Sequence, residues 1–175
     1  MNNTLELIKS RRSIRKFKPE LPEKKELEAI VEAGLCAANG AGKQAAIIVA
    51  VTDKALRARL VEMNRKIGNY PEGHDPFYGA PAFLIVLADK AVPTHVYDGS
   101  VALANMLLAA HSLGLGSIWI HRAKEEFESD EGKEILKELG IEGDYEGIGH
   151  CAVGYMEGPL PKAKERKPGR VFWAE

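Results

Sequence analysis

The sequence lacks several features that mark particular classes of protein. It holds only two cysteines, Cys36 and Cys151, which form no CxxC pair, so no disulfide framework is expected and both are interpreted as buried small side chains. No apolar run reaches the roughly 18 to 20 residues of a membrane span. The first residues, MNNTLELIKSRR, lack the apolar segment of a signal peptide. We therefore expect a cytoplasmic protein with no membrane partner.

An excess of charge of one sign is absent as well. The 24 Lys and Arg residues nearly balance the 25 Asp and Glu residues, and the formal net charge is −1. Without a global positive field, no nucleic acid is expected as a partner. The five histidines show no HxxxH or HExxH spacing, so no metal site is expected. No GxSxG motif occurs, which leaves a serine hydrolase without support.

The apolar pattern predicts one domain, 1–175, built of alternating helices and strands. Uninterrupted apolar runs predict strands buried on both faces at 46–53 and 82–89, followed by strands at 117–120 and 147–155. Helices packed on such a sheet form an α/β or α+β sandwich. Helices are predicted at 4–10, 54–67 and 129–140. A further predicted helix has Pro22 in its first turn and an apolar stripe of Leu27, Ile30, Val31 and Leu35. Another starts at Asp98 or Ser100 and is ended by Gly114 and Gly116.

The segment SRRSIRKF, residues 10–17, concentrates positive charge near the start of the chain. Arginines beside a serine form a common phosphate-binding set, because forked N–H donors and a hydroxyl suit phosphate oxygens. A second basic cluster near the other end of the chain suits the same phosphate, although a solvated charged face is equally compatible with the residues alone. The first cluster holds Arg11, Arg12, Arg15 and Lys16, and the second holds Lys162, Lys164, Arg166, Lys167 and Arg170.

The stretch AANGAGKQ, residues 37–44, nearly matches a phosphate-binding loop. Ala37 replaces its first Gly and Gln44 replaces its final Ser or Thr, and a predicted helix precedes it where a strand is needed, so an ATPase is rejected. Two interpretations stay open: a flexible connection, or a loop whose amides approach a planar ligand with Asn39 and Gln44 as polar contacts. The GLGS stretch at 114–117 follows a helix, so no dinucleotide fingerprint is expected there.

Several motifs, taken in chain order, resemble the nitroreductase family of FMN-dependent oxidoreductases. They are an N-terminal RRSxRxF, a Gln before an apolar strand, ANMLLAAHSLGLGSIWI, a VGY strand and a basic tail. The resemblance spans nearly the whole chain and implies an α+β three-layer sandwich, in which helices flank a central antiparallel or mixed sheet. It also implies a homodimer that holds FMN at the subunit interface.

The resemblance further implies which residues bind the cofactor. The match to RRSxRxF implies contacts to the FMN phosphate, the ribityl chain and the pyrimidine edge, where a cation stabilises the negative charge of reduced flavin. The basic-x-basic pair of the tail would complete the phosphate site. The residues concerned are Arg11, Arg12, Ser13 and Arg15 for the first motif, and Lys164 and Arg166 for the tail.

Two further segments take roles by the same resemblance. Gln44 matches the Gln of the family loop P-S-x-x-N-x-Q-P-W, and Asn39, from the other subunit, takes the Ser position of that loop. After the third strand, Ile120, His121 and Arg122 would lie along the flavin, with a backbone N–H directed at its N5 atom.

The chain departs from the family pattern at several positions of these segments. Ala38 and Gly42 replace the Pro and Asn of the loop, and Ala45 and Ala46 replace its Pro-Trp. Arg122 stands where a Gly is usual near N5. We expect FMN binding to survive these changes, whereas the substrate and robust nitroreduction are put in doubt.

The expected activity is a ping-pong oxidoreductase reaction. A nicotinamide cofactor, NADH or NADPH, would pass a hydride to flavin N5, and a nitro, quinone or similar small acceptor would then be reduced. No acid–base residue is assigned, because His121 is as compatible with a structural role as with a catalytic one. The alternatives are a flavin-binding storage or sensor protein with little turnover, a phosphate-ligand-binding protein without flavin, and an enone, dehalogenating or flavin-degrading enzyme.

Overall fold

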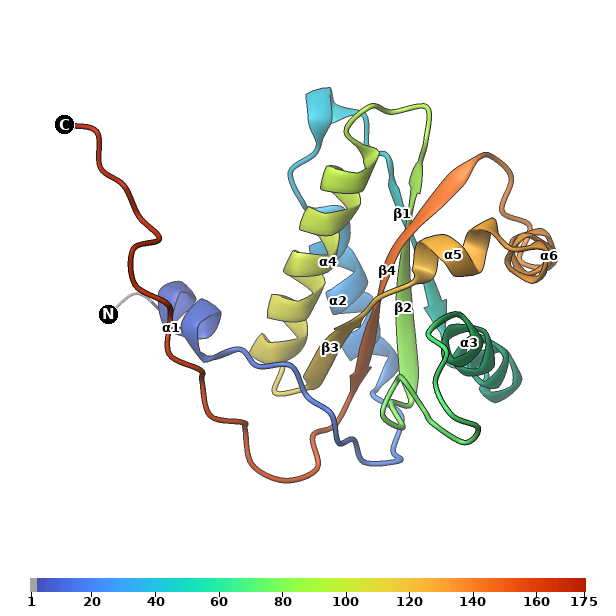
Figure 1. Cartoon of the computed structure of the whole chain (residues 1–175), viewed down its shortest axis with the longest axis horizontal. Helices are drawn as coiled ribbons and strands as arrows, with labels where there is room; N and C mark the ends of the chain where they lie inside the picture. Colours follow the sequence, from blue (N-terminus) through green and yellow to red (C-terminus); the bar gives the residue numbers. More distant parts are fainter. Residues whose placement is uncertain (1–2) are drawn as a thin grey trace.

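A four-stranded antiparallel sheet forms the middle layer of the protein, and helices cover both of its faces (Figure 1). The computed structural model describes residues 3–175. The α+β three-layer sandwich predicted from the sequence is therefore confirmed, with an antiparallel sheet. In spatial order the strands are β1 (Ala46–Val51), β2 (Ala82–Asp89), β4 (Tyr145–Gly154) and β3 (Gly116–Ile120).

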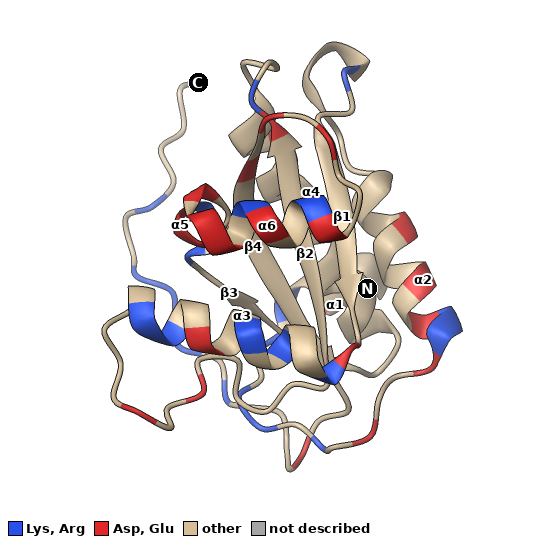
Figure 2. Cartoon of the chain, turned by 90° about the vertical axis from the view of Figure 1, so that its right-hand side faces the viewer, with Lys and Arg blue, Asp and Glu red and all other residues tan. Residues whose placement is uncertain are grey.

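The helical layers lie on opposite faces of the sheet (Figure 1). One layer holds α2 (Lys24–Leu35) and α4 (His95–Ser112). The other holds α3 (Lys54–Ile67), α5 (Ala123–Glu128) and α6 (Asp130–Glu138). Figure 2 shows Lys and Arg mixed with Asp and Glu on α6, whereas α3 carries mainly Lys and Arg.

Strand β2 supplies both hydrophobic cores. Phe83 and Ile85 face the core beneath α3, α5 and α6, whereas Leu84 and Val86 face the core beneath α2 and α4. The side chains alternate between the two cores because successive residues of a strand point to opposite faces. All four are buried, since helices cover both faces. The prediction of a strand buried on both faces at 82–89 is confirmed. For 46–53 the same prediction is wrong, since β1 is an edge strand that ends at Val51 and is only partly buried before it.

Several predicted boundaries are also wrong, for reasons visible in the capping contacts. Helix α4 begins at His95, because the Asp98 carboxylate accepts from the Gly40 N–H and the Thr94 hydroxyl and does not cap a helix. Helix α2 begins at Lys24, two residues after Pro22, with Glu23 in a capping box.

Three further differences concern the role predicted for Gly116, the burial predicted for Leu35, and a short helix that was not predicted. Gly116 starts β3 and does not end the preceding helix. Leu35, predicted on a buried stripe, is exposed. Helix α5 was not predicted at all, because its six residues are too short for a periodic pattern.

The two cysteines differ in environment. Cys36 is exposed, so its interpretation as a buried residue is wrong, whereas Cys151 is fully buried in β4. Burial raises the pKa of Cys151 to about 12, and a protonated thiol is a poor nucleophile. Thiol catalysis by Cys151 is therefore excluded. Within residues 3–175, no helix combines the length and the apolar character that a bilayer crossing requires.

The outer face of α4 and the last part of the chain leave apolar side chains uncovered. Tyr97 and Val101 are 73% and 41% exposed on α4. Residues 157–175 form no helix or strand and extend away from the sheet (Figure 1). Phe172 and Trp173 in this tail are 90% and 83% exposed. Such apolar surfaces on a folded chain indicate contacts with another molecule.

Candidate functional site

The basic segment after α1 (Asn3–Ser10) is attached to the free edge of β3. The Ile14 N–H donates to the Ser117 carbonyl at 3.0 Å, and Ser13 forms a parallel β-bridge with Ser117. Ser117 itself is buried. The sheet therefore fixes the backbone that carries Arg11, Arg12 and Arg15. This basic segment is not a free charged tail.

Two arginines present buried donors that have no partner. Arg11 Nη1 and Arg12 Nε are inaccessible to solvent and form no hydrogen bond within the described part of the chain. Arg12 Nη1 donates to the carbonyls of Lys9 and Arg11, at 2.7 Å each. Because a buried unpaired donor on a cation is costly, these orphaned groups indicate a site for an anion. They fit a phosphorylated cofactor such as FMN.

His111 reports on the same positive charge. Its Nε2 atom lies 2.9 Å from the Ser10 hydroxyl. Burial lowers the pKa of His111 below its usual value, and the charges of Arg11 and Arg12 lower the pKa further. The lowered pKa favours the neutral imidazole of His111, so the positive charge of this region is carried by the arginines.

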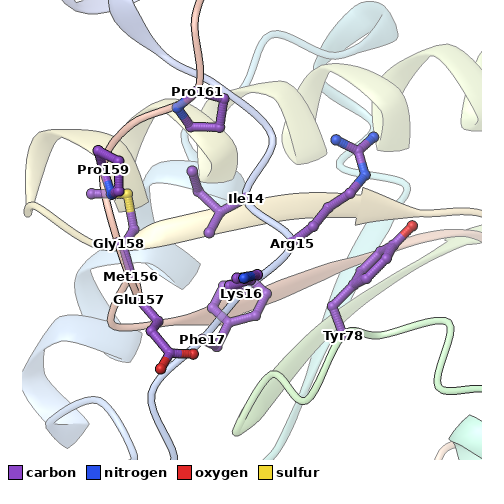
Figure 3. Close-up of a pocket in the computed structure, with 10 residues that line it drawn as sticks. All are labelled: Ile14, Arg15, Lys16, Phe17, Tyr78, Met156, Glu157, Gly158, Pro159 and Pro161. Atoms are coloured by element: carbon purple, nitrogen blue, oxygen red, sulfur yellow. The ribbon is translucent and has the colours of Figure 1, made fainter.

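Arg15 and Tyr78 stand together at one side of a pocket of about 490 Å³ (Figure 3). The Arg15 guanidinium lies over the Tyr78 ring, 5.8 Å from its centroid, a cation–π contact that fixes a long side chain. The pocket has the size of a small-molecule site. The other lining residues are Ile14, Lys16, Phe17, Met156, Glu157, Gly158, Pro159 and Pro161.

The segment after β3 combines backbone strain with a second cation–π contact. Arg122 has a φ of 80°, in the left-handed region that favours glycine. Its guanidinium lies 5.1 Å from the centroid of the Tyr70 ring, and Tyr70 stacks on His74 at 4.4 Å. Arg15 and Arg122 thus both contact tyrosines of one loop, 68–80.

Asn39 and Gln44 lie at the opposite end of α4 from the basic cluster. They line a separate pocket of about 300 Å³ beside Asp98, whereas the cluster contacts His111 near the other end of this helix. Helix α4 has 18 residues and spans roughly 27 Å. A single chain therefore does not bring these two predicted parts of the site together.

The loop itself holds Asn39. The Asn39 side chain accepts from the Gln44 N–H at 3.0 Å and donates to the Ala37 carbonyl at 3.3 Å. The Gln44 side chain, in contrast, forms no hydrogen bond with residues 3–175 and is exposed. Lys164 and Arg166 are exposed in the tail and make no ion pair with the described residues. The tail begins beside the basic segment, because Pro159 and Pro161 line the same pocket as Arg15 and Lys16.

Comparison with known proteins identifies the family. The model of the nitroreductase family matches residues 8–155. The chain belongs to the nitroreductase family. An NADPH-flavin oxidoreductase from Vibrio harveyi is 36% identical over 183 residues, which cover 98% of this chain and 72% of that protein. A relative from Methanothermobacter thermautotrophicus is 37% identical over 127 residues, and this match spans only 60% of the relative's length.

Solved structures agree with this assignment over the whole chain. A nitroreductase with bound FMN from Bacteroides fragilis superposes with a TM-score of 0.89, at 29% identity and with 100% of both chains covered. A nitroreductase with bound FMN from Desulfitobacterium hafniense also gives a TM-score of 0.89, at 27% identity over 100% of both chains. The three-layer fold is therefore that of the nitroreductase family.

Membership of the nitroreductase family gives the strain at Arg122 a context. The resemblance places a glycine at this position, and the positive φ of Arg122 is the conformation that glycine tolerates best. The arginine retains the backbone shape and adds a cation next to Tyr70. Sequence reasoning noted the replacement but had no means to find the tyrosine partner, which lies 52 residues away in the chain.

Three buried polar residues near this segment were missed as a group. Asn64, Glu126 and His150 are fully buried and contact one another. Asn64 lies one helical turn after the buried Leu60. A polar residue in phase with an apolar stripe was the sequence pattern that could have indicated a buried polar side chain. Nothing in the sequence indicated that the three side chains converge.

The pKa of His111 gives a test of the basic cluster. Replacing Arg11 or Arg12 by Gln should raise this pKa toward its usual value, because a neighbouring positive charge is removed. Since the unfolded chain binds the His111 proton more readily than the folded chain, this group should make folding less stable as the pH falls through about 6.5. NMR titration of the imidazole measures the change.

The control variant is Lys16→Gln, which removes an exposed cation that does not act on His111. It should leave the pKa unchanged. An unaltered His111 pKa in both arginine variants would contradict the placement of their charges beside this ring.

Proposed function

We propose that the protein, acting as a single domain over residues 1–175, is an FMN-dependent oxidoreductase that uses NADH or NADPH to reduce a nitro, quinone or similar small acceptor. The observation that carries the proposal is the pair of buried, unpartnered donors Arg11 Nη1 and Arg12 Nε on a segment fixed to the sheet. The names of relatives support it: a Bacillus subtilis FMN reductase (NADPH) is 28% identical over 78% of this chain.

The residues around the site suit the parts of FMN. Arg11, Arg12 and Ser13 provide cationic donors and a hydroxyl for the phosphate and the ribityl chain. Arg15, held by Tyr78, provides a cation for the electron-rich pyrimidine edge. When bound, FMN supplies the hydride-transfer chemistry between NAD(P)H and the acceptor, while the protein supplies binding, orientation and electrostatics. No side chain is assigned as an acid or base.

A second copy of the chain would complete the site. Asn39 and Gln44 lie near one end of α4 and the arginines near its other end, so a two-fold arrangement can place the loop of one subunit beside the cluster of the other. The exposed Tyr97 and Val101 on α4 offer an apolar contact surface for such a homodimer. Lys164 and Arg166 would complete the phosphate site from the tail, which begins beside the basic segment.

The tail of a partner subunit has a suitable place to bind. A groove of about 590 Å³ runs between α2 and β1, with an apolar floor that includes Leu27 and Val31. Glu28 and Glu32 line the same groove. The tail combines exposed aromatic residues at 172–173 with preceding basic residues, so its apolar and charged parts both complement the groove.

We also propose a cytoplasmic location. Cys36 is exposed and Cys151 is buried, so the two thiols do not pair within the chain. Free thiols of this kind persist in a reducing compartment.

Cofactor binding is tested by removing the two arginines at either side of the segment. The double variant Arg11→Ala/Arg15→Ala should weaken FMN binding by about 3 kcal/mol, or roughly a hundredfold in Kd, because charge-assisted hydrogen bonds are lost. Quenching of FMN fluorescence during titration of the apoprotein measures Kd. Arg59→Ala is the matched control, since Arg59 pairs with Glu138 of α6 and does not belong to the basic segment. Equal FMN affinity in the double variant and the control would refute the assignment.

Turnover is tested on the purified, FMN-loaded protein. Under anaerobic conditions, NADH or NADPH should bleach the flavin absorbance, and a quinone or nitroaromatic acceptor should restore it. A loaded protein that neither cofactor bleaches would indicate a storage or sensor role. A protein that gains no flavin absorbance even with added FMN would indicate a different phosphorylated ligand.

The homodimer is tested through the tail. Phe172→Asp/Trp173→Asp should weaken self-association, because two charges enter the proposed apolar groove of the partner. Sedimentation velocity over a concentration series measures the association. Glu175→Gln, at the end of the same tail, is the control. A dimer of unchanged strength in the double variant would argue against docking of the tail, and a monomeric wild-type protein would argue against the dimer.

A further inference from the structure

Three fully buried polar side chains join α3, α5 and β4 beneath the candidate site. His150 lies in β4, paired with Ile85 of β2 on one side and with Ile120 of β3 on the other. Its Nε2 atom is 2.6 Å from Glu126 Oε2, and the Asn64 amide donates to Glu126 Oε1. All three are 0% exposed. Buried charged and polar groups of this kind are seldom favourable for stability alone, because apolar residues of similar size serve as well.

The network ends on the backbone that follows β3. Asn64 Nδ2 donates to the His121 carbonyl at 2.8 Å. The Glu126 N–H donates to the Arg122 carbonyl at 3.0 Å. The buried side chains thus hold the His121 carbonyl, and the first backbone hydrogen bond of α5 holds the Arg122 carbonyl. A left-handed φ at a non-glycine residue such as Arg122 persists only where the surroundings fix the backbone strongly.

The geometry of the peptide group determines what this anchoring achieves. In a planar trans peptide the carbonyl and the N–H point in opposite directions. Because the His121 carbonyl points inward to Asn64, the Arg122 N–H of the same peptide points away from the network. This N–H forms no hydrogen bond with any group of residues 3–175. It is a free donor in a fixed orientation at the end of β3.

We propose that Asn64, supported by Glu126 and His150, is a positioning residue that aims the Arg122 N–H at the N5 edge of bound flavin. The inference rests on the proposed function, since it assumes that FMN binds. N5 accepts a hydrogen bond in oxidised flavin and carries a hydrogen itself in reduced flavin. A fixed N–H donor therefore stabilises the oxidised form more than the reduced form, and its preorganisation costs nothing when the cofactor binds.

The test is the two-electron midpoint potential of the FMN-loaded Asn64→Leu variant, which keeps the branched shape of the side chain and removes the amide. Oxidised FMN should bind about tenfold more weakly than to the wild type while reduced FMN binds about equally, so the potential should rise by about 30 mV. Dye-equilibrated reduction followed by absorbance measures the potential, and fluorescence titration measures the affinity for oxidised FMN.

Leu60→Ala is the matched control, because Leu60 is 0% exposed, lies one turn earlier on the same helix and has an apolar side chain that forms no hydrogen bond with the network. It should lower the melting temperature and leave the potential unchanged. If Asn64→Leu lowers the affinity for both redox forms equally, its potential stays at the wild-type value. Asn64 then has only a structural role and the inference is overturned.

A second variant covers the case in which Asn64→Leu does not fold. Asn64→Ala also removes the amide that holds the His121 carbonyl, and its smaller side chain fits the same space without a change of charge. An upward shift of its potential supports the inference, and a wild-type potential overturns it. A wild-type protein that binds no FMN would overturn the proposed function together with this inference. A loaded wild type with unshifted variants would overturn this inference alone.

Discussion

Strand β2 must be buried on both of its faces, and the layered architecture follows from this requirement. Its side chains alternate between two separate cores, and nearly all of them are fully buried. Removing either helical layer would expose half of them to water, which is why helices are required on both faces. The antiparallel neighbours β1 and β4 then place β3 at an edge of the sheet.

The free edge of β3 is where the candidate site forms. The segment with Ser13 and Ile14 pairs with that edge through Ser117, and this pairing holds cations in partly buried positions that solvent alone would not favour. Behind the end of the strand, the buried group of Asn64, Glu126 and His150 fixes the peptide at 121–122. Positive donors on one side and a rigid polar anchor on the other suit an anionic, planar cofactor.

A single chain does not bring all the predicted parts of the cofactor site together. The loop with Asn39 and Gln44 is well organised by Asp98, yet it lies beside the opposite end of α4 from the arginines. The apolar outer face of α4 and the aromatic end of the tail are exposed. If α4 is buried between two copies of the chain, the loop of one copy can lie beside the arginines of the other, and the exposed apolar side chains are covered.

The elements that depend on local pattern are readable from the amino-acid sequence. The apolar run of β2 and the stripe of α3 identify their strand and helix, because burial on a sheet or under a helix imposes a period of 2.0 or 3.6 residues. The family motifs also identified the basic segment and the position of Arg122. Short or edge elements were less certain: α5 has too few residues for a period, and β1 reads as buried although it is an edge strand.

The contacts between distant side chains become visible only once the chain is folded. Arg122 contacts Tyr70, Arg15 contacts Tyr78, and Asn64 reaches the carbonyl of His121. These contacts join residues from different helices, strands and loops, and no local periodicity encodes them, since they depend on how the layers pack. The separation of Gln44 from the arginines was likewise decided by packing, because the rigid length of α4 lies between them.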